Sequence, residues 1–520
     1  MSLKRRSTVI CMVLIVLLAA AVAGSAVYVH GKADQAVNGN ILSESKLVLY
    51  DGPKSLKDAS AEDLEATSEF QRDISLMHCT DTQIKVNGYD CYVYDTNVNN
   101  SRQWHEYYAP PLSRTPMTYF DFEGATVIQI TVPDRKLDSV KISPVSYGIK
   151  AQTDKQNHTV TFTVTKPDAY TVTFDDSPAR AVHIFANPME TEVPAKDDKR
   201  VIYIGPGEWN IESIMLEDNQ TLYLAGGSVV HTIVNGNFVK NVKVMGRGII
   251  DGSQYKGWQG RTAFIPLKFD HCDNVTLEDV IVLNPNAWVC QAYDSQNGVI
   301  DGIKIISPRP NGDGITLQSC QNYEVRNCFV RSWDDSLVVK NYDTNSSNIT
   351  FSHNQLWTDL AQSMEVGYET NKGSKSDSKI TGIHFENITV LNNFHKPVIS
   401  VHNADDAVVS DISFRDIVVE NAQMGSGDGA KMPYLIDLHI AQDQNWSTTK
   451  DRGVIKDVTI DNVRVLSGKN SPSRIKGFDA EHAVENVTIS NLEILGEKIT
   501  DFAGGHFEID KPTTKNISLK

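Results

Sequence analysis

A short phrase recurs through the second half of the chain and limits the folds that this half can adopt. It places an asparagine, aspartate or glycine before a strand-like alternation of apolar and polar residues. The copies are Asn274–Leu277, Gly302–Ile305, Asn322–Val325, Asn348–Phe351, Gly382–Phe385, Asp411–Phe414, Asp457–Ile460, Asn486–Ile489 and Asn516–Leu519. They start 28, 20, 26, 34, 29, 46, 29 and 30 residues apart, and no stretch between them shows a long helical period. Each unit is therefore one or two short strands and a turn.

Units of this size cannot bury their own apolar side chains, so they must stack on one another. Stacked strands without crossover helices predict a right-handed single-stranded parallel β-helix over residues 200–520, with a basic coil of ~20–25 residues. Intervals above 30 residues predict inserted loops, the largest between Val419 and Val458. Such loops commonly rise on one side and wall a groove.

The first part of the chain has a different pattern. Residues 126–132, 159–165 and 170–174 alternate with a period of two, as strands with one buried face do. Short strands separated by turns predict an antiparallel β-sandwich over residues 38–195. The polar segment Asn187–Asp198 contains two prolines and marks the boundary between the two domains. The fold class is therefore all-β, with an N-terminal β-sandwich followed by the β-helix.

Residues 1–30 have the pattern of a signal peptide or membrane anchor. Lys4, Arg5 and Arg6 precede an apolar run, and small residues follow it. The stretch from Thr8 to Val29 has 22 residues, enough to span a bilayer if it is not cleaved. We therefore expect a secreted or cell-surface protein, and in the uncleaved case a membrane tether.

The length and charge of the chain limit the classes of molecule that it can bind. A chain of 520 residues is long enough for about two or three domains. The net charge of −16 argues against a nucleic-acid partner, because binding to phosphates requires a basic face and none of the Lys/Arg clusters is dense enough to form one. We expect a monomer with a polysaccharide or oligosaccharide substrate.

The cysteines do not have the spacing of metal ligands. Cys79 and Cys91 flank a hairpin-like stretch with an Asn-Gly turn, and the sequence leaves a disulfide between them open. Four others lie in strand-like contexts and are predicted to be small buried hydrophobic residues: Cys272, Cys290, Cys320 and Cys328. We expect no bound metal and no cofactor.

Three carboxylates are the strongest candidates for chemistry. Asp334 and Asp335 follow Asp313 by 21 and 22 residues, about one coil, so stacking would place them on neighbouring coils. Neighbouring strands lie ~4.8 Å apart. Consecutive side chains of a regular strand point to opposite faces, so the backbone must bend if both members of the pair face solvent. An Asp-Asp pair alone is more often part of a surface turn, but the third acid, Trp333 and Lys340 favour a catalytic site.

Crowded carboxylates raise one another's pKa and keep a proton available near neutral pH. Cleavage of a glycosidic bond needs such a proton for the leaving oxygen and a carboxylate that activates water. In inverting hydrolases the two groups lie ~6.5–9.5 Å apart, and in retaining ones ~5–5.5 Å.

The spacing of Asn311–Asp313, Asp334–Asp335 and Val338–Lys340 resembles the motifs of glycoside hydrolase family 28, the polygalacturonases. The resemblance covers about residues 200–465. It implies that Asp334 is the general acid and that Asp313 and Asp335 hold the attacking water.

The chain also departs from family 28. Gln362 stands where that family has the histidine of a Gly-His-Gly segment. The coil that should carry an Arg-Ile-Lys grip on a uronate carboxylate reads Pro397–His402 instead. A site without that cationic clamp is poorly suited to galacturonate.

A second resemblance is to glycoside hydrolase family 49, the dextranases and isopullulanases, which carry a β-sandwich before a right-handed β-helix and act on neutral α-glucans. It also uses three aspartates. Asn348–Phe351, Leu356–Trp357 and Glu365–Tyr368 look like its following coils. The domain order favours family 49, while the motif spacing fits family 28 at least as well.

The sequence therefore predicts a secreted, inverting O-glycosyl hydrolase, with a neutral, dextran-like glucan favoured as substrate. Three alternatives stay open: a polygalacturonase-like pectin hydrolase, a polysaccharide lyase that uses Ca²⁺ and a basic residue, and a non-catalytic carbohydrate-binding solenoid.

Further residues are expected to contact the sugar. Trp288, Trp333 and Trp357 would stack on sugar rings, although each is equally suited to packing. The predicted polar contacts are Lys340, Gln362, Glu365, His395, His402 and Asp405.

Overall fold

The computed structural model describes residues 27–31, 45–64, 75–98, 113–255, 264–395, 397–423 and 434–520. Residues 1–26, most of the predicted signal peptide or anchor, lie outside these ranges. Within them, every helix is too short or too polar to cross a membrane. The three helices are α1 (Ala61–Leu64), η1 (Val145–Tyr147) and η2 (Lys511–Thr513).

The first domain contains two sheets that pack against each other. The first sheet consists of β1 (Val27–Gly31), β2 (Ser45–Leu49), β3 (Met77–His78), β6 (Tyr94–Val98), β7 (Ser113–Glu123), β9 (Val140–Ser143), β12 (Asp168–Phe174) and β13 (Ser177–Pro188). The second consists of β4 (Gln83–Val86), β5 (Tyr89–Asp90), β8 (Thr126–Thr131), β10 (Gln152–Asp154) and β11 (Thr159–Val164). Neighbouring strands are antiparallel apart from β7 and β13, which are parallel.

The predicted alternation builds the core of this sandwich. Ile128 and Ile130 of β8 and Val160 and Phe162 of β11 are buried, while the residues between them are more exposed. This is the pattern of strands with one face toward a core. The disulfide that the sequence left open is not formed, because Cys79 and Cys91 are both free thiols.

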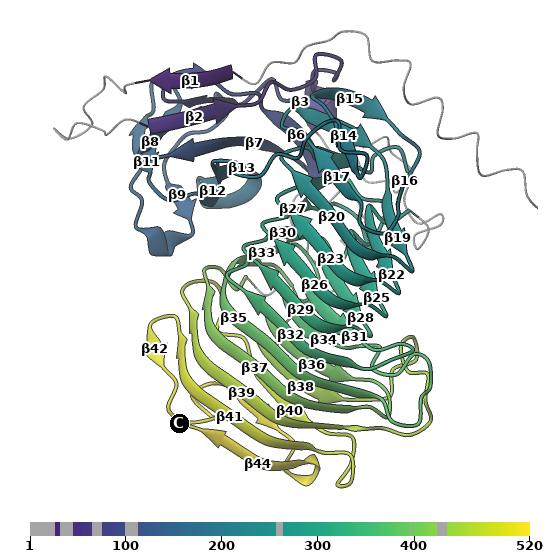
Figure 1. The fold of residues 1–520 in the computed structure, drawn as a ribbon. Helices are drawn as coiled ribbons and strands as arrows, with labels where there is room; N and C mark the ends of the chain where they lie inside the picture. Colours follow the sequence, from purple (N-terminus) through teal and green to yellow (C-terminus); the bar gives the residue numbers. More distant parts are fainter. Residues whose placement is uncertain are drawn as a thin grey trace, which may run out of the picture.

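The second domain is a parallel β-helix in which each coil adds strands to two sheets (Figure 1). We call them the long sheet and the short sheet. The long sheet consists of β14 (Val201–Ile204), β15 (Gly207–Asn210), β17 (Thr221–Leu224), β18 (Ser228–His231), β20 (Lys240–Gly246), β21 (Ile249–Asp251), β23 (Asp273–Glu278), β24 (Ile281–Leu283), β26 (Gln296–Asp301), β27 (Lys304–Ile306), β29 (Gln321–Arg326), β30 (Phe329–Ser332), β32 (Ser346–Ser352), β33 (Gln355–Thr358), β35 (Lys379–Asn393), β37 (Val408–Val419), β39 (Val454–Val465), β41 (Val484–Ile494), β42 (Glu497–Lys498) and β44 (Thr514–Leu519). The short sheet consists of β16 (Ile214–Leu216), β19 (Val234–Asn237), β22 (Leu267–Asp270), β25 (Cys290–Tyr293), β28 (Ile315–Gln318), β31 (Leu337–Lys340), β34 (Met364–Val366), β36 (Ile399–Asn403), β38 (Ile436–Ile440), β40 (Ser473–Lys476) and β43 (Phe507–Ile509).

The recurring asparagine has a structural cause. Asn297, Asn322 and Asn348 have φ of 57°, 57° and 54°, in the left-handed region that asparagine tolerates better than most residues. The side-chain amide of Asn322 donates to the side-chain oxygen of Asn297, one coil earlier, at 3.0 Å, and that of Asn348 donates to the side-chain oxygen of Asn322 at 2.8 Å. The phrase thus marks a bend and a ladder of amides between coils.

The strand register corrects two details of the predicted repeat. Thr276 and Leu277 pair with Val299 and Ile300, so the copy in that coil is Asn297–Ile300 and not Gly302–Ile305. The other copies pair as predicted, from Tyr323 with Ile349 through to Val487 with Ile517. The interval between Val419 and Val458 is not one inserted loop, because β38 lies within it and continues the short sheet.

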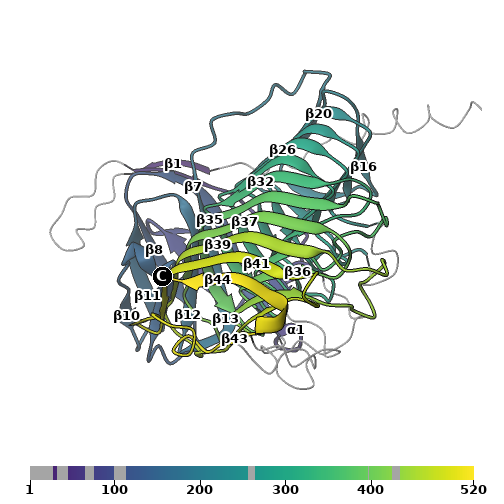
Figure 2. The same ribbon diagram turned by 90° about the horizontal axis from the view of Figure 1, so that it is seen from below.

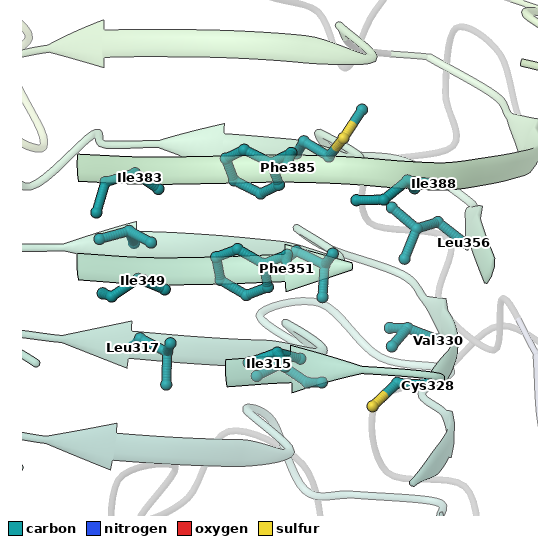
Figure 3. Close-up of a cluster of buried hydrophobic side chains, with 14 of the residues drawn as sticks. Ile315, Leu317, Cys328, Val330, Ile349, Phe351, Leu356, Ile383, Phe385 and Ile388 are labelled. Carbon is teal, nitrogen blue, oxygen red and sulfur yellow. The ribbon is translucent and has the colours of Figure 1, made fainter. Parts of the chain in front are cut away.

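Apolar side chains stack along the inside of the coils (Figure 3). Phe351, Phe385 and Phe414 form a continuous stack with ring centroids 4.8 and 4.9 Å apart. The prediction for the four cysteines is confirmed, since Cys272, Cys290, Cys320 and Cys328 are free and buried in this core. The core fixes the register of every coil, because a shift of one residue would turn apolar side chains outward.

The sandwich packs beside the β-helix, against its long sheet (Figure 2). Phe185 of β13 contacts Phe329 of β30 with ring centroids 5.1 Å apart. The buried Arg247 donates from Nε to Oδ1 of Asp121 at 2.9 Å. Moving the two domains apart would leave a buried charge without its partner, which is costly. The pair therefore holds the two domains together.

Candidate active site

The strand register places the carboxylates at equivalent positions of neighbouring coils. Ile315 of β28 pairs with Leu337 of β31, and Asp313 and Asp335 each lie two residues before these partners. The backbone N–H of Gly314 donates to the carbonyl oxygen of Asp335 at 2.8 Å, so hydrogen bonds hold the two turns together. The spacing of 22 residues in the sequence is thus one coil, as predicted.

The backbone bends at Asp334, as the sequence required. Residues 333–336 form the turn between β30 and β31. The Asp334 carboxylate accepts N–H bonds from Asp335 and, one coil earlier, from Asn311, both at 3.1 Å. The Ser332 hydroxyl donates to the carbonyl oxygen of Asp334 at 2.6 Å. The turn therefore holds the Asp334 side chain between the two coils.

The three carboxyl groups differ in exposure. Asp313 is 2% exposed and Asp335 is 6% exposed, whereas Asp334 is half-buried. Burial is the main cause that raises the pKa of Asp313 to about 7; the charges of Asp334 and Glu369 act in the same direction, and Lys340 acts in the opposite one. Burial and the charges of Asp334, Asp313 and Glu365 raise the pKa of Asp335 well above its usual range. The cluster thus has one accessible carboxyl group and two shielded ones that hold protons unusually tightly.

Lys340 is the cation of this cluster. Its Nζ lies 3.6 Å from Oδ2 of Asp313 and 3.2 Å from Oε2 of Glu369. The ring centroid of Trp288 lies 5.3 Å from the same nitrogen. Burial opposes the charge, but Glu369 and Asp313 together raise the pKa of Lys340 well above its usual range. Lys340 therefore stays charged, and its charge is directed at carboxylates within the protein.

Gln362 and Glu365 lie beside the aspartates on the next coil, and His402 lies beside Glu365 on the coil after it. The backbone N–H of Gln362 donates to Oδ1 of Asp335 at 3.1 Å, and its side-chain amide donates to the Tyr368 hydroxyl at 3.1 Å. Glu365 is buried, with Oε1 lying 3.7 Å from Nδ1 of His402. The structure therefore brings Gln362 and Glu365 next to the aspartates, and His402 next to Glu365.

His402 is held as a cation. Its ring stacks on Tyr368 at a centroid distance of 4.2 Å, and its Nε2 lies 3.2 Å from Asp437. Burial lowers the pKa of His402, but Asp437 and Glu365 outweigh it and raise the pKa to about 9.

Four predicted sugar contacts lie elsewhere or are covered. Trp357 packs between the domains, with His183 edge-on at 5.9 Å and the Arg331 guanidinium 4.6 Å from its ring centroid. Trp333 is 2% exposed and His395 is fully buried beside Phe394. Asp405 accepts backbone N–H bonds from Thr448 and Thr449 and so fixes a loop. The structure does not support a sugar-binding role for these residues.

The sequence also contains an Arg-Ile-Lys segment, but it does not lie on the coil where family 28 has its cationic clamp. Arg474, Ile475 and Lys476 lie on β40, three strands beyond β34 in the short sheet, and not on the coil next to Gln362. Arg474 donates twice to Asp437, at 2.8 and 2.7 Å, and once to His439 at 3.0 Å. The guanidinium thus already occupies the space between His402, Asp437 and His439, three residues that otherwise have the spacing of metal ligands.

The sequence did not identify Glu369 and Tyr368 as site residues. Tyr368 entered only as part of the resemblance to family 49, and nothing in the local pattern distinguishes Glu369 from an ordinary turn residue. They reach the site because the backbone N–H of Asn341 pairs with the carbonyl oxygen of Glu369 at 2.9 Å. Only the coil-to-coil register could have found them.

The model of glycosyl hydrolases family 28 matches residues 190–506, more than half of the chain. The chain belongs to glycosyl hydrolases family 28. Membership makes it an O-glycosyl hydrolase and resolves the choice between families that the sequence patterns left open.

The relatives of this family 28 chain include two plant proteins named polygalacturonase. One, from Brassica napus, is 24% identical over 333 residues, which are 59% of this chain and 77% of the relative. The other, from Cryptomeria japonica, is 21% identical over 298 residues, 53% of this chain and 55% of the relative. Among solved structures, Dex49A from Penicillium minioluteum aligns with a TM-score of 0.66 and 14% identity, over 95% of this chain and all of Dex49A. That likeness confirms the fold.

The raised pKa of Asp335 gives a pH-dependent effect on stability. Between the ordinary aspartate pKa of 3.8 and the raised one, the folded protein keeps a proton that the unfolded chain has released, so stability falls as pH rises through this window. Asp335→Asn removes this ionisation. The unfolding midpoint of the variant relative to the parent protein should therefore be higher at pH 8 than at pH 4, measured by thermal unfolding.

Asp411→Asn, at an exposed aspartate, controls for the loss of one negative charge. A difference between Asp335→Asn and the parent that is equal at both pH values, or larger at pH 4, would contradict the account.

Proposed function

We propose that this protein is an inverting polysaccharide hydrolase in which Asp334 is the general acid and Asp313 and Asp335 activate the water. The observation that carries the proposal is the difference in exposure among three carboxylates on adjoining coils: Asp334 is accessible, and the other two lie buried beside it. An accessible acid can reach the glycosidic oxygen of a bound chain. Two shielded carboxylates can hold a water molecule on the other side of the sugar.

The proposed reaction is a single displacement. Asp334 gives its proton to the leaving oxygen while the bond from that oxygen to the anomeric carbon breaks. Water attacks the same carbon from the opposite face, and its proton passes to the carboxylate of Asp313 or Asp335. Because coupled carboxyl groups share their protons, the raised pKa values describe a cluster that keeps one proton near neutral pH and still offers one base.

Lys340 keeps that base available. Without a cation nearby, two buried aspartates beside Asp334 would both be protonated over much of the neutral range. The Lys340 ammonium lies 3.6 Å from Asp313 and lowers its pKa against the effect of burial. We therefore infer that, of the two buried aspartates, Asp313 ionises first and accepts the proton of the water.

A neutral glucan fits the cations of this site better than a polyuronate does. Lys340 is buried against Asp313 and Glu369, and Arg474 is bound to Asp437. The coil after Gln362 offers His402 where family 28 has its cationic clamp, and His402 is paired with Asp437. These cations are already neutralised, which disfavours recognition of a substrate carboxylate. A polygalacturonase is the second candidate, favoured by the names of the relatives.

Replacing the general acid separates catalysis from binding. Asp334→Asn keeps the size of the side chain and one of the two oxygens that accept N–H bonds, but it cannot supply a proton in the same way. Release of reducing ends should fall by ~10²–10⁴-fold, the usual contribution of a general acid. Affinity electrophoresis should show glycan binding unchanged.

The matched control is Asp411→Asn, at an exposed aspartate of β37 in the long sheet, which should keep its activity. Full activity of the Asp334→Asn protein would show that Asp334 is not the general acid. Loss of glycan binding together with activity would show that Asp334 maintains the fold and not the reaction.

Lys340→Met tests the ionisation of Asp313. Losing the cation raises the pKa of Asp313 further, so a higher pH is needed to form the base. The acidic limb of the pH dependence of kcat/KM should therefore move to higher pH, while Lys340→Arg, which keeps the charge, should move it much less. An acidic limb at the same pH in Lys340→Met would show that Asp313 is not the base.

A substrate panel distinguishes the two candidate functions. Dextran, pullulan and polygalacturonate, each with its short oligomers, are incubated with the protein and the products are sized. The proposal predicts products from a neutral glucan and none from polygalacturonate. Cleavage of polygalacturonate alone would establish the second candidate, with Asp334→Asn protein as the blank in each reaction.

A further inference from the structure

A row of aromatic rings runs along one edge of the short sheet toward the carboxylates. Phe238 stacks on His271 with centroids 4.5 Å apart and an interplanar angle of 22°. His271 meets Tyr293 edge-on at 5.7 Å, and Tyr293 meets Tyr342 edge-on at 5.9 Å. We call these four residues the aromatic row.

The register of the sheet shows that the row is continuous with the site. Phe238 and His271 directly follow β19 and β22, Tyr293 ends β25, and Tyr342 follows β31. The ends of these strands pair in turn: Asn237 with Asp270, Asp270 with Tyr293, Tyr293 with Gln318, and Gln318 with Lys340. Figure 1 shows β19, β22, β25, β28 and β31 stacked in this order.

The row ends at the catalytic cluster through direct contacts. The Tyr342 hydroxyl donates to Oε1 of Glu369 at 3.3 Å. Glu369 pairs with Lys340, and Lys340 with Asp313. A chain that lies on the rings would therefore reach the edge of the cluster at Glu369 and Lys340, and Lys340 contacts Asp313.

The aromatic row is not explained by packing. Phe238 is 70% exposed, the most exposed large apolar side chain of the described residues. Phe238 and His271 both have φ of 55°, which costs a bulky side chain about 1 kcal/mol or more. An exposed ring in a strained conformation adds nothing to the core, which points to a role on the surface.

The spacing of the row suits a sugar chain. Each step from one coil to the next is ~4.8 Å, and the ring-centroid distances of 4.5, 5.7 and 5.9 Å limit the row to about 16 Å from Phe238 to Tyr342. One step is close to the length of one pyranose residue in an extended polysaccharide. Aromatic side chains present a flat apolar face beside polar groups, which matches the C–H faces and hydroxyl groups of sugar rings. The row is therefore long enough to hold several sugar residues beyond the bond that is cleaved.

The charges along the row select against an acidic polymer. Asp270 and Asp294 bind the two ring nitrogens of His271 at 2.7 and 3.1 Å, and Asp343 accepts a hydrogen bond from the Tyr293 hydroxyl. Lys268 lies 4.0 Å from Asp270. Three carboxylates against one lysine and a histidine repel a polyuronate, while carboxylate oxygens accept hydrogen bonds from the hydroxyl groups of a neutral glycan.

We propose that the aromatic row binds a neutral polysaccharide over several sugar residues and guides it into the catalytic cluster. This inference rests on the proposed hydrolase function and adds that the preferred substrate is a long, uncharged chain. Phe238, His271 and Tyr293 then determine specificity for chain length and do not touch the reacting atoms.

Binding is measured first in the Asp334→Asn background, so that the chain is not cleaved. Affinity electrophoresis with dextran, pullulan and polygalacturonate compares that protein with versions that also carry Phe238→Ala or Tyr293→Ala. Phe238→Tyr keeps a ring and is the matched control. Each alanine variant should weaken binding of a neutral polymer by ~10-fold, and Phe238→Tyr by much less. Unchanged binding in the alanine variants, or tighter binding of polygalacturonate than of either glucan, overturns the proposal.

Kinetics separates this proposal from the hydrolase assignment. In the otherwise unchanged protein, Phe238→Ala should raise KM for the long polymer by ~10-fold, keep its kcat, and leave kcat/KM for the shortest cleaved oligomer unchanged. An equal loss of kcat/KM on the polymer and on the shortest oligomer would refute the aromatic row as a polymer-binding site but would leave the hydrolase function intact. No cleavage of any glycan by the parent protein refutes the hydrolase function itself.

A second copy of this chain is the other occupant to exclude. If the parent protein sediments as a dimer and Phe238→Ala makes it a monomer without affecting polymer binding, Phe238 serves an interface between subunits and the proposal fails.

Discussion

Backbone hydrogen bonds between successive coils are the interaction on which the site depends. They hold each coil one strand spacing from the next and make residues at equivalent positions neighbours in space. Asp313, Asp335 and Gln362 are such equivalents, each two residues before a paired residue of the short sheet. The apolar stack inside the coils maintains this register, because slippage would expose it. The proposed catalytic cluster is thus formed by residues that are far apart in the chain and regular in their spacing.

The same regularity brings like charges together, and the protein compensates for this locally. Asp313, Asp334 and Asp335 repel one another in a buried setting, which is unfavourable for folding at neutral pH. Lys340 offsets part of this, and backbone N–H groups from two coils satisfy Asp334. The sandwich supports the far side of the same turn: His183 accepts a hydrogen bond from Arg331 at 3.1 Å, and Arg331 directly precedes Ser332, which bonds to Asp334. The first domain therefore stabilises the coil that carries Asp334.

The sequence was sufficient for features that repeat or that depend on local geometry. The stacked coils, the alternating strands of the sandwich, the bend at Asp334 and the juxtaposition of Asp313 with Asp335 all follow from periodicity and strand geometry. Features that depend on docking could not be found in this way. Trp357 resembles a sugar-stacking residue in sequence, but the sandwich covers it. Glu369 and the aromatic row can be identified only when the register is known. Gly302–Ile305 matches the sequence pattern of the repeat, but its strand residues belong to β27, a different strand of the coil.

The stereochemistry of the first product tests the central claim most directly. Proton NMR of the fresh reducing end, recorded before mutarotation, reports whether the anomeric configuration has changed. A direct attack by water held between Asp313 and Asp335, with Asp334 protonating the leaving oxygen, predicts a product of inverted configuration. A product of retained configuration would mean that one aspartate forms a covalent bond to the sugar, and it would contradict the roles assigned to all three.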